Sequence, residues 1–245
     1  QGAFLQDSRA LRDAAGDRIR SAFDTVAAPS MPVAAYGDDG LEALPGNAET
    51  DGLVMWSQAL GIAGNASGAG DAAGFDHTTG GLLVGADTSV GGWRFGVLTG
   101  YSETSFDVGA RASSGTADNV HLGLYAGTEW GALGFRTGAT YGWHSIETTR
   151  NVVFPAFSER LSADYDATTA QVFGELGYRF DLNPTVLEPF ANLAYVRLDT
   201  DGFTEKGGTT AALVSEDDTM ETAFTTIGLR ASSDLPFGPG RAVMR

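Results

Sequence analysis

Cysteine is absent from the 245-residue sequence, histidine occurs three times, and no apolar run reaches the roughly 18 residues of a membrane-crossing helix. The absence of cysteine excludes disulfides and cysteine-ligated metal sites, and it suits a chain that is exported without oxidative cross-linking. The N-terminus, QGAFLQDSRALRD, lacks the basic and then apolar pattern of a signal peptide. If the protein is exported, we therefore expect this chain to be a mature product or an excised piece.

Positive charge is also scarce. The chain has 15 Lys and Arg residues against 31 Asp and Glu residues, which gives a net charge of −16. This balance argues against nucleic acid and against anionic lipid headgroups as simple electrostatic partners.

Catalytic signatures are missing as well. His77, His121 and His144 form no HExxH pattern, and the serine in GNASGAG lies outside a GxSxG elbow. The sequence therefore predicts no catalytic residue, no metal site and no cofactor, and we expect the chain not to be an enzyme.

Glycine is abundant, at 34 residues, and 42% of the residues are hydrophobic. This composition predicts an ordered protein, with room for one large β domain or two small ones. Only residues 4–26 form a convincing helix, because Leu11, Ala15 and Ile19 recur at helical spacing among several arginines. An amphipathic helix docked on a soluble core is an alternative for this segment. Residues 28–50 are predicted to be a linker that leads into the first strand.

From Gly52 onward the pattern changes to two-residue alternation. The predicted strands span residues 52–62, 79–89, 92–105, 117–129, 132–148, 162–181, 185–199 and 219–233. The connections between them alternate strictly between long and short, so every second turn lies at the same end of an up-and-down sheet. This loop asymmetry is typical of outer-membrane barrels.

Side chains in Gly131–Arg150 separate into an apolar set and a nearly empty set. Leu133, Phe135, Tyr141 and Trp143 share one parity, whereas the other parity carries glycine and a few polar groups. In a soluble barrel, glycine would leave the outer surface bare. In a membrane barrel, the apolar set faces lipid, aromatic residues near the strand ends form an interfacial girdle, and glycine makes room inside. We favour the membrane barrel over a soluble ligand-binding β-barrel.

Six segments together resemble a known family, the C-terminal translocator β-domain of autotransporters (type V secretion) of Gram-negative bacteria. The similar segments are GGLLVGADTSV…WRFGVLTGYS (80–102), HLGLYAGTEWG (121–131), ATYGWHSIETTR (139–150), ADYDATTAQVFGELGYRFDL (163–182), LEPFANLAYVRLDTDGFTEKGG (187–208) and TTIGLRAS (225–232). They cover residues 50–245 in order and with family-like spacing.

The resemblance implies an all-β, antiparallel, up-and-down transmembrane β-barrel of twelve strands with an N-terminal helix in the pore. It also implies an outer-membrane location with external loops at the cell surface, and export of an N-terminal passenger domain. The implied partners are the lipid bilayer, the passenger and the outer-membrane barrel assembly machinery. Residues 1–27 match the pore-helix position and residues 51–245 match the barrel.

The chain departs from the family pattern at its C-terminal end. Eight strands plus a stub precede Arg245, and an open sheet in lipid would leave unsatisfied backbone edges. We therefore expect a piece of a longer precursor, with the barrel incomplete at the C-terminus. An alternative is an outer-membrane enzyme or adhesin whose activity lies in the missing passenger.

Charged residues on the inward parity are the candidate site residues. On the strands they are Asp87, Arg94, Arg136, Glu175, Arg179, Glu188 and Arg230. On the helix, the candidate partners are Arg12, Asp13, Asp17, Arg18 and Arg20. These groups either hold the pore helix or form an ordinary solvated lining, and the sequence does not decide between the two. The inward glycines are expected to leave space for the helix.

Some members of the family cut themselves at an asparagine in the pore helix. Residues 1–28 contain no asparagine, and the first one is Asn47. Self-cleavage within the helix is therefore not predicted, and the passenger is expected to stay attached or to be cut elsewhere.

Overall fold

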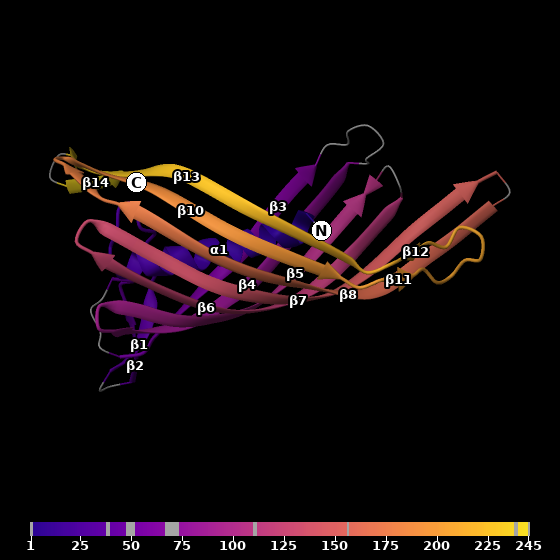
Figure 1. The fold of residues 1–245 in the computed structure, drawn as a ribbon, viewed down its shortest axis with the longest axis horizontal. Coiled ribbons are helices and arrows are strands. Elements are labelled where there is room, and N and C mark those ends of the chain that lie inside the picture. The colour runs from indigo at the N-terminus through magenta and orange to yellow at the C-terminus, as the bar shows by residue number, and fades with distance from the viewer. Residues whose placement is uncertain are drawn as a thin grey trace.

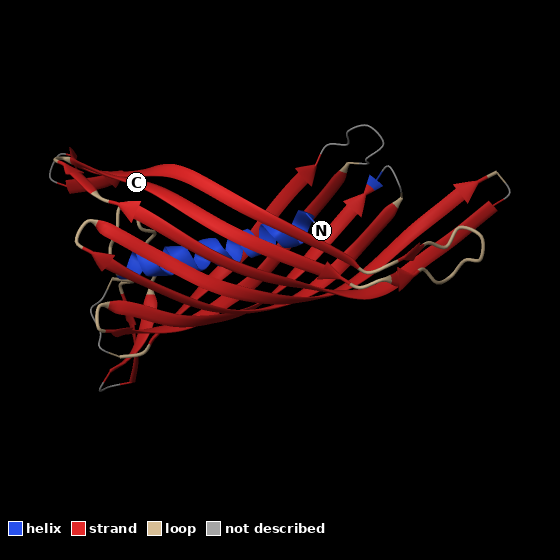
Figure 2. Cartoon of the chain, viewed as in Figure 1, coloured by secondary structure: helices blue, strands red, loops and turns tan. Residues whose placement is uncertain are grey.

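The computed structural model describes residues 2–37, 40–47, 52–66, 74–109, 112–155, 157–237 and 240–244. Within these residues one long helix, α1 (Gly2–Ala22), lies in a trough formed by a large antiparallel sheet (Figure 1). Figure 2 shows the helix following the concave side of the strands.

Eight long strands form the wall of the trough in the described part of the chain. They are β3 (Val54–Ala66), β4 (Phe75–Val90), β5 (Trp93–Val108), β6 (Ser113–Trp130), β7 (Leu133–Phe154), β8 (Phe157–Tyr178), β10 (Thr185–Thr200) and β13 (Asp218–Phe237). Each pairs antiparallel with the next in chain order. The predicted meander of eight strands around the helix is therefore confirmed.

Shorter strands complete the description. β9 (Phe180–Leu182) pairs with β10, β14 (Gly240–Met244) pairs with β13, and β11 (Phe203–Thr204) pairs with β12 (Val214–Ser215) in a separate two-stranded sheet. In the described residues, the sheet path begins at β14 and ends at the hairpin described next.

The region expected to be a linker contains a hairpin, β1 (Val33–Gly37) with β2 (Gly40–Leu44), and β1 continues the sheet by pairing with β3. The hairpin forms because side chains alternate along β1: Val33 and Ala35, which are 4% and 7% exposed, face inward and join the core next to the helix. The helix also ends earlier than predicted, because the chain adopts a left-handed conformation at Asp24 (φ 49°).

The outer face of the sheet is apolar and exposed, as the alternation predicted. Leu122, Leu124 and Trp143 are 50%, 61% and 46% exposed. The two ends of the sheet differ: β4 and β5 are joined by the tight turn at Gly91–Gly92, where both glycines have positive φ, whereas β10 and β13 are joined by residues 201–217. Among the described residues, no helix is long and apolar enough to cross a membrane.

Candidate functional site

The site is the contact between α1 and the concave side of the sheet, a space that we call the lumen. The apolar side of the helix presents Leu11, Ala15 and Ile19, which are at most 3% exposed and pack into one cluster with inward residues of the strands. Leu98 and Phe173 belong to that cluster. Both apolar side chains lie on the inner face of the sheet, where the helix offers them an apolar surface.

Arg18 of α1 is anchored to Asp87 of β4. Its Nε donates to Asp87 Oδ2 at 2.7 Å, and its second terminal nitrogen donates to Oδ1 at 2.9 Å. Both side chains are 0% exposed. A two-pronged pair of this kind fixes both the position and the rotation of the helix.

The Asp87 carboxylate has two further partners in the wall. Arg94 of β5 forms a second ion pair with it, and the Tyr125 hydroxyl donates to Oδ2 at 2.7 Å. The Trp56 indole N–H donates to the Tyr125 hydroxyl oxygen, also at 2.7 Å. The hydrogen-bond network around Arg18 therefore includes side chains from four strands, β3, β4, β5 and β6.

A second polar contact lies nearer the N-terminal end of α1. Arg12 donates to the Gln171 side-chain oxygen at 3.1 Å, and the Gln171 amide donates to the Ser8 carbonyl at 2.8 Å. The same amide donates to the Thr140 hydroxyl at 3.2 Å. Gln171 thereby forms hydrogen bonds to both the backbone and a side chain of α1. The sequence analysis did not select this residue because it is uncharged.

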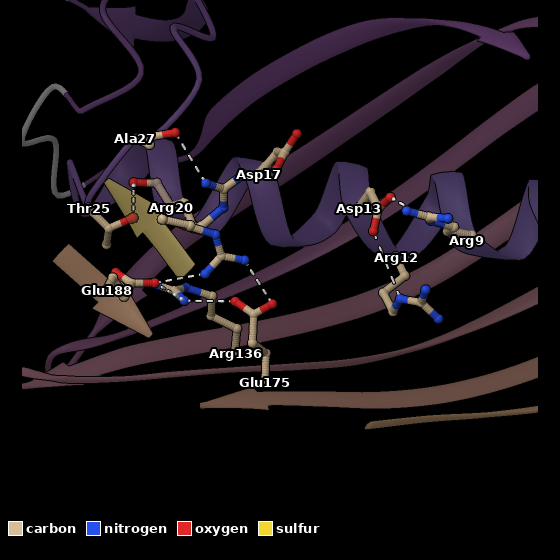
Figure 3. A network of polar contacts seen from close by, with 11 residues as sticks. Arg9, Arg12, Asp13, Asp17, Arg20, Thr25, Ala27, Arg136, Glu175 and Glu188 are labelled. Carbon is tan, nitrogen blue, oxygen red and sulfur yellow. Dashed lines mark hydrogen bonds and ion pairs between the residues drawn. The ribbon is translucent and has the colours of Figure 1, made fainter. Parts of the chain in front are cut away.

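The other helical candidates pair within the helix, as Figure 3 shows. The Asp13 carboxylate lies 3.5 Å from Arg9 Nε and 3.9 Å from Arg12 Nε, and the Asp17 carboxylate forms an ion pair with Arg20. Among the five predicted helix residues, Arg12 and Arg18 are the two whose described hydrogen bonds or ion pairs reach the strands. The geometry of a helix makes neighbours of residues three or four apart, so these charges neutralise one another locally.

Four of the predicted wall residues form one network beside the C-terminal half of α1 (Figure 3). Arg136 contacts Glu175 at 2.8 Å and Glu188 at 3.1 Å. Arg230 contacts the same two carboxylates at 2.9 Å and 2.7 Å. The two carboxylates on β8 and β10 lie between the arginines on β7 and β13, and each arginine contacts both of them, so the network joins four strands on their inner side.

Arg179 differs from its predicted place. Its side chain is 50% exposed and pairs with Asp181 at 2.9 Å, apart from both networks. The reason is local: β8 ends at Tyr178, and the Arg179 amide bonds to the Ala132 carbonyl at the edge of a short turn. The inward parity does not extend past the end of the strand.

Inward glycines make room mainly for large neighbouring wall residues. A Cβ atom at Gly96 would lie 2.2 Å from the Tyr125 ring, and one at Gly138 would lie 2.5 Å from the Phe173 ring. Gly127 of β6 faces the helix directly, and a Cβ there would lie 2.4 Å from Ile19. The predicted space for the helix is thus partly indirect: glycines admit Tyr125 and Phe173, which then contact the helix or its anchor.

The three histidines lie in the lumen near the N-terminal end of α1. His77 contacts Gln6 at 3.0 Å, His121 contacts Ser102 at 3.0 Å, and His144 contacts Asn119 and Thr169. Phe4 of α1 stacks on His144 with ring centroids 4.3 Å apart. Within the described residues, no group of three or more His, Asp or Glu side chains is placed to hold a metal ion.

Asp7 is a buried helix residue that the sequence analysis did not select. It is 1% exposed, and neither carboxylate oxygen has a hydrogen-bond partner within the described part of the chain. Its helical spacing of four residues from Leu11 marked it as a residue of the inner face.

Residues 55–244 match the model of the family Autotransporter beta-domain. The chain belongs to this family. Two relatives named extracellular serine protease, from Serratia marcescens, are 39% and 38% identical over 95% and 94% of the chain. The chain spans about a fifth of the length of these relatives.

Two solved structures have the same fold. The translocator domain of the autotransporter NalP from Neisseria meningitidis has a TM-score of 0.64 at 16% identity, over 94% of this chain and 73% of that one. The β-domain of the Bordetella autotransporter BrkA has a TM-score of 0.54 at 22% identity, over 86% and 73%. As a member of the family Autotransporter beta-domain, the chain is an outer-membrane translocator domain of a Gram-negative bacterium, and its role is passenger export.

Proposed function

We propose that this autotransporter β-domain exports a passenger that precedes residue 1, in a precursor whose later strands close the barrel. The observation that carries this proposal is the buried pair of Arg18 and Asp87, which holds the polypeptide inside the lumen. Because the apolar outer face of the strands is turned to lipid and α1 lies on their opposite side, the strands separate the held chain from lipid.

The direction of the helix sets the direction of export. Gln6, near the start of α1, contacts His77 close to the long connection between β3 and β4, whereas Arg18 contacts Asp87 close to the short turn at Gly91–Gly92. We therefore place the long loops at the cell surface and the short turns in the periplasm. A chain that precedes Gly2 would then leave the lumen on the outside.

Catalysis is proposed to lie outside residues 1–245. The two Serratia relatives are named extracellular serine proteases, and this chain spans only a fifth of them, so their names say nothing about the matched region itself.

We also propose that the outer-membrane barrel assembly machinery inserts the domain, since the apolar outer face requires a bilayer. The lumen is occupied by α1, which leaves the soluble ligand-binding barrel without its cavity.

A surface-display experiment tests the proposal. The full-length precursor is expressed in a Gram-negative host, and protease is added to intact cells. We expect the passenger to be digested from outside, and to stay in the periplasm when residues 52–245 are deleted. A passenger that remains inaccessible in intact cells with the full precursor would overturn the proposal.

A further inference from the structure

A strip of small residues crosses the outer face of three neighbouring strands, β6, β7 and β8 (Figure 1). Ala126 of β6 pairs with Thr137 of β7, and Thr137 pairs with Gly174 of β8. We call these three residues the strip. They share the outward parity with large apolar residues of the same strands, such as Leu124 and Leu176. The outer face is therefore lower along the strip than beside it.

Two grooves on the outer face adjoin at the strip. One has a volume of about 520 Å³, and its lining includes Phe95, Leu124 and Thr137. The other has a volume of about 590 Å³, and its lining includes Phe135 and Gly174. Because Thr137 and Gly174 are direct partners across two strands, the grooves are neighbours, and together we call them the outer groove. Each volume lies within the roughly 300–1,000 Å³ that ligand pockets usually have.

The outer groove presents an apolar surface, although the sheet behind it carries charges. Asp87 and Glu175 border the groove, but their carboxylates face the lumen, where each has an arginine partner. The Thr137 hydroxyl donates to the Phe173 carbonyl at 2.7 Å, so its hydrogen is already used within the sheet. The polar groups at the groove are therefore satisfied by the protein itself, and the groove suits an apolar occupant.

An aromatic cluster fixes the level of the strip in the membrane. Trp93, Trp130 and Phe135 lie at the short-turn end, with ring centroids 5.7 Å apart for the two tryptophans and 6.2 Å apart for Trp130 and Phe135. Such aromatic belts lie at the level of the lipid headgroups. Ala126 is four residues from Trp130, which is about 13 Å along the strand. The strip therefore lies beside the acyl chains of the leaflet at the short-turn end.

We propose that the outer groove holds one acyl chain of a phospholipid from that leaflet. As an autotransporter β-domain, the protein is embedded in the outer membrane, so the groove is continuous with a surface that lipid already covers. An acyl chain in the groove contacts protein atoms beneath it and on both sides, whereas one on a flat surface contacts them only beneath. Since dispersion contacts add up, the seated chain is held more strongly than its neighbours. This inference goes beyond passenger export and does not depend on the direction of export.

A second copy of the domain is the competing occupant, because small residues let two backbones approach closely within a membrane. Two features favour the acyl chain. The side chains beside the strip protrude, since Leu124 and Val172 are 61% and 55% exposed, and they would hold a second sheet away from the strip. The Thr137 hydroxyl, which could bond to a protein partner, already donates to Phe173. A narrow and flexible occupant fits this shape better than a second barrel wall.

Photolabelling of the reconstituted full-length precursor tests the proposal. The vesicles contain phosphatidylethanolamine and phosphatidylglycerol, with a trace of phosphatidylethanolamine that carries a diazirine on one acyl chain. Gly174→Leu fills the groove, and its Cβ would lie 3.9 Å from the Arg136 carbonyl oxygen, which is an ordinary contact. Gly80→Leu is the matched control on β4, outside the groove: within the described residues, nothing lies within 4 Å of a Cβ added there.

The label is mapped by mass spectrometry on residues 124–139, which neither substitution changes. We expect the label in the wild type to be concentrated there, to fall by about threefold in Gly174→Leu and to stay unchanged in Gly80→Leu, because only the first variant removes the contacts of the groove. Even labelling of all outward apolar residues in the wild type overturns the proposal. Equal labelling of residues 124–139 in the two variants overturns it as well.

A second measurement separates a bound lipid from a second copy. Native mass spectrometry of the precursor released from a mild detergent should show a phospholipid on the monomer of the wild type and of Gly80→Leu, and about threefold less of it on Gly174→Leu. Heat-modifiable migration of the barrel confirms that both variants are folded. Wild-type monomers without phospholipid, or wild-type dimers that Gly174→Leu dissociates, overturn the proposal.

Discussion

Arg18 and Asp87 lie 69 positions apart in the chain and form a two-pronged ion pair with no exposed side-chain surface. Removal of the anion alone would leave two buried cations, Arg18 and Arg94, without their shared partner. A buried pair that loses one partner is much less stable than either the intact pair or an apolar replacement.

Asp87→Asn should therefore weaken the folded domain of the full-length precursor by about 3–5 kcal/mol. Urea unfolding of the purified protein in detergent measures the change. Asp181→Asn, at a side chain that is 67% exposed, is the matched control and should change stability by less than about 1 kcal/mol. Equal stability of the two variants would show that the helix is not held by this pair.

Gly127→Val should displace the helix. The new Cβ would lie 2.4 Å from Ile19, and an overpacked site of this kind costs about 1–3 kcal/mol. Thermal unfolding measures the loss, and the second substitution Ile19→Ala should recover part of it, since the two residues share one space. Gly61→Val, where nothing lies within 4 Å of the added atom, is the control; a loss of equal size there would count against a helix contact.

Leu122→Arg should disrupt insertion. Leu122 is 50% exposed on the outer face of β6, and a cation near the bilayer midplane costs about 2–4 kcal/mol on a barrel surface. Thr116→Arg, on the same face of the same strand but nearer its end, should cost about 0–1 kcal/mol. Unfolding from lipid vesicles measures both variants, and similar costs would contradict a lipid-facing outer side.

The connection 201–217 should loosen from the hairpin of β7 and β8 in acid. Arg150 binds the Glu205 carboxylate, and the Glu159 carboxylate accepts the Thr209 and Ala211 amides. The Arg150 hydrogen bond holds the pKa of Glu205 below its ordinary value of 4.5, and the Thr209 and Ala211 amides lower the pKa of Glu159. The stabilisation by both carboxylates is therefore complete above about pH 4.5 and is lost as the pH falls through the lowered values.

Hydrogen exchange of residues 201–217 measures this effect. Protection should be constant from neutral pH to about pH 5, after correction for the intrinsic exchange rate, and should fall below the ordinary carboxyl value of 4.5. The double variant Glu159→Gln, Glu205→Gln is the control and should show weak protection at every pH. A wild-type loop that keeps full protection down to pH 2 would contradict attachment through Glu159 and Glu205.

The fold could be predicted from the sequence because its signals are local. Alternation along the strands gave eight long strands and their two faces, and the order of long and short connections gave the meander. Arg136 and Glu175 were selected for the lumen by parity alone, and the structure places both there. The same rule misplaced Arg179, since parity has no meaning beyond the end of a strand.

The sequence by itself determined which side chains face lipid and which face the lumen, because a pleated strand alternates its side chains whatever its neighbours are. Only the tertiary structure decided which lumen groups meet: Arg18 with Asp87, Arg12 with Gln171, and the loop at Glu205 with Arg150. These contacts depend on the stagger between strands and on the rotation of the helix, which are fixed jointly by packing across the whole sheet.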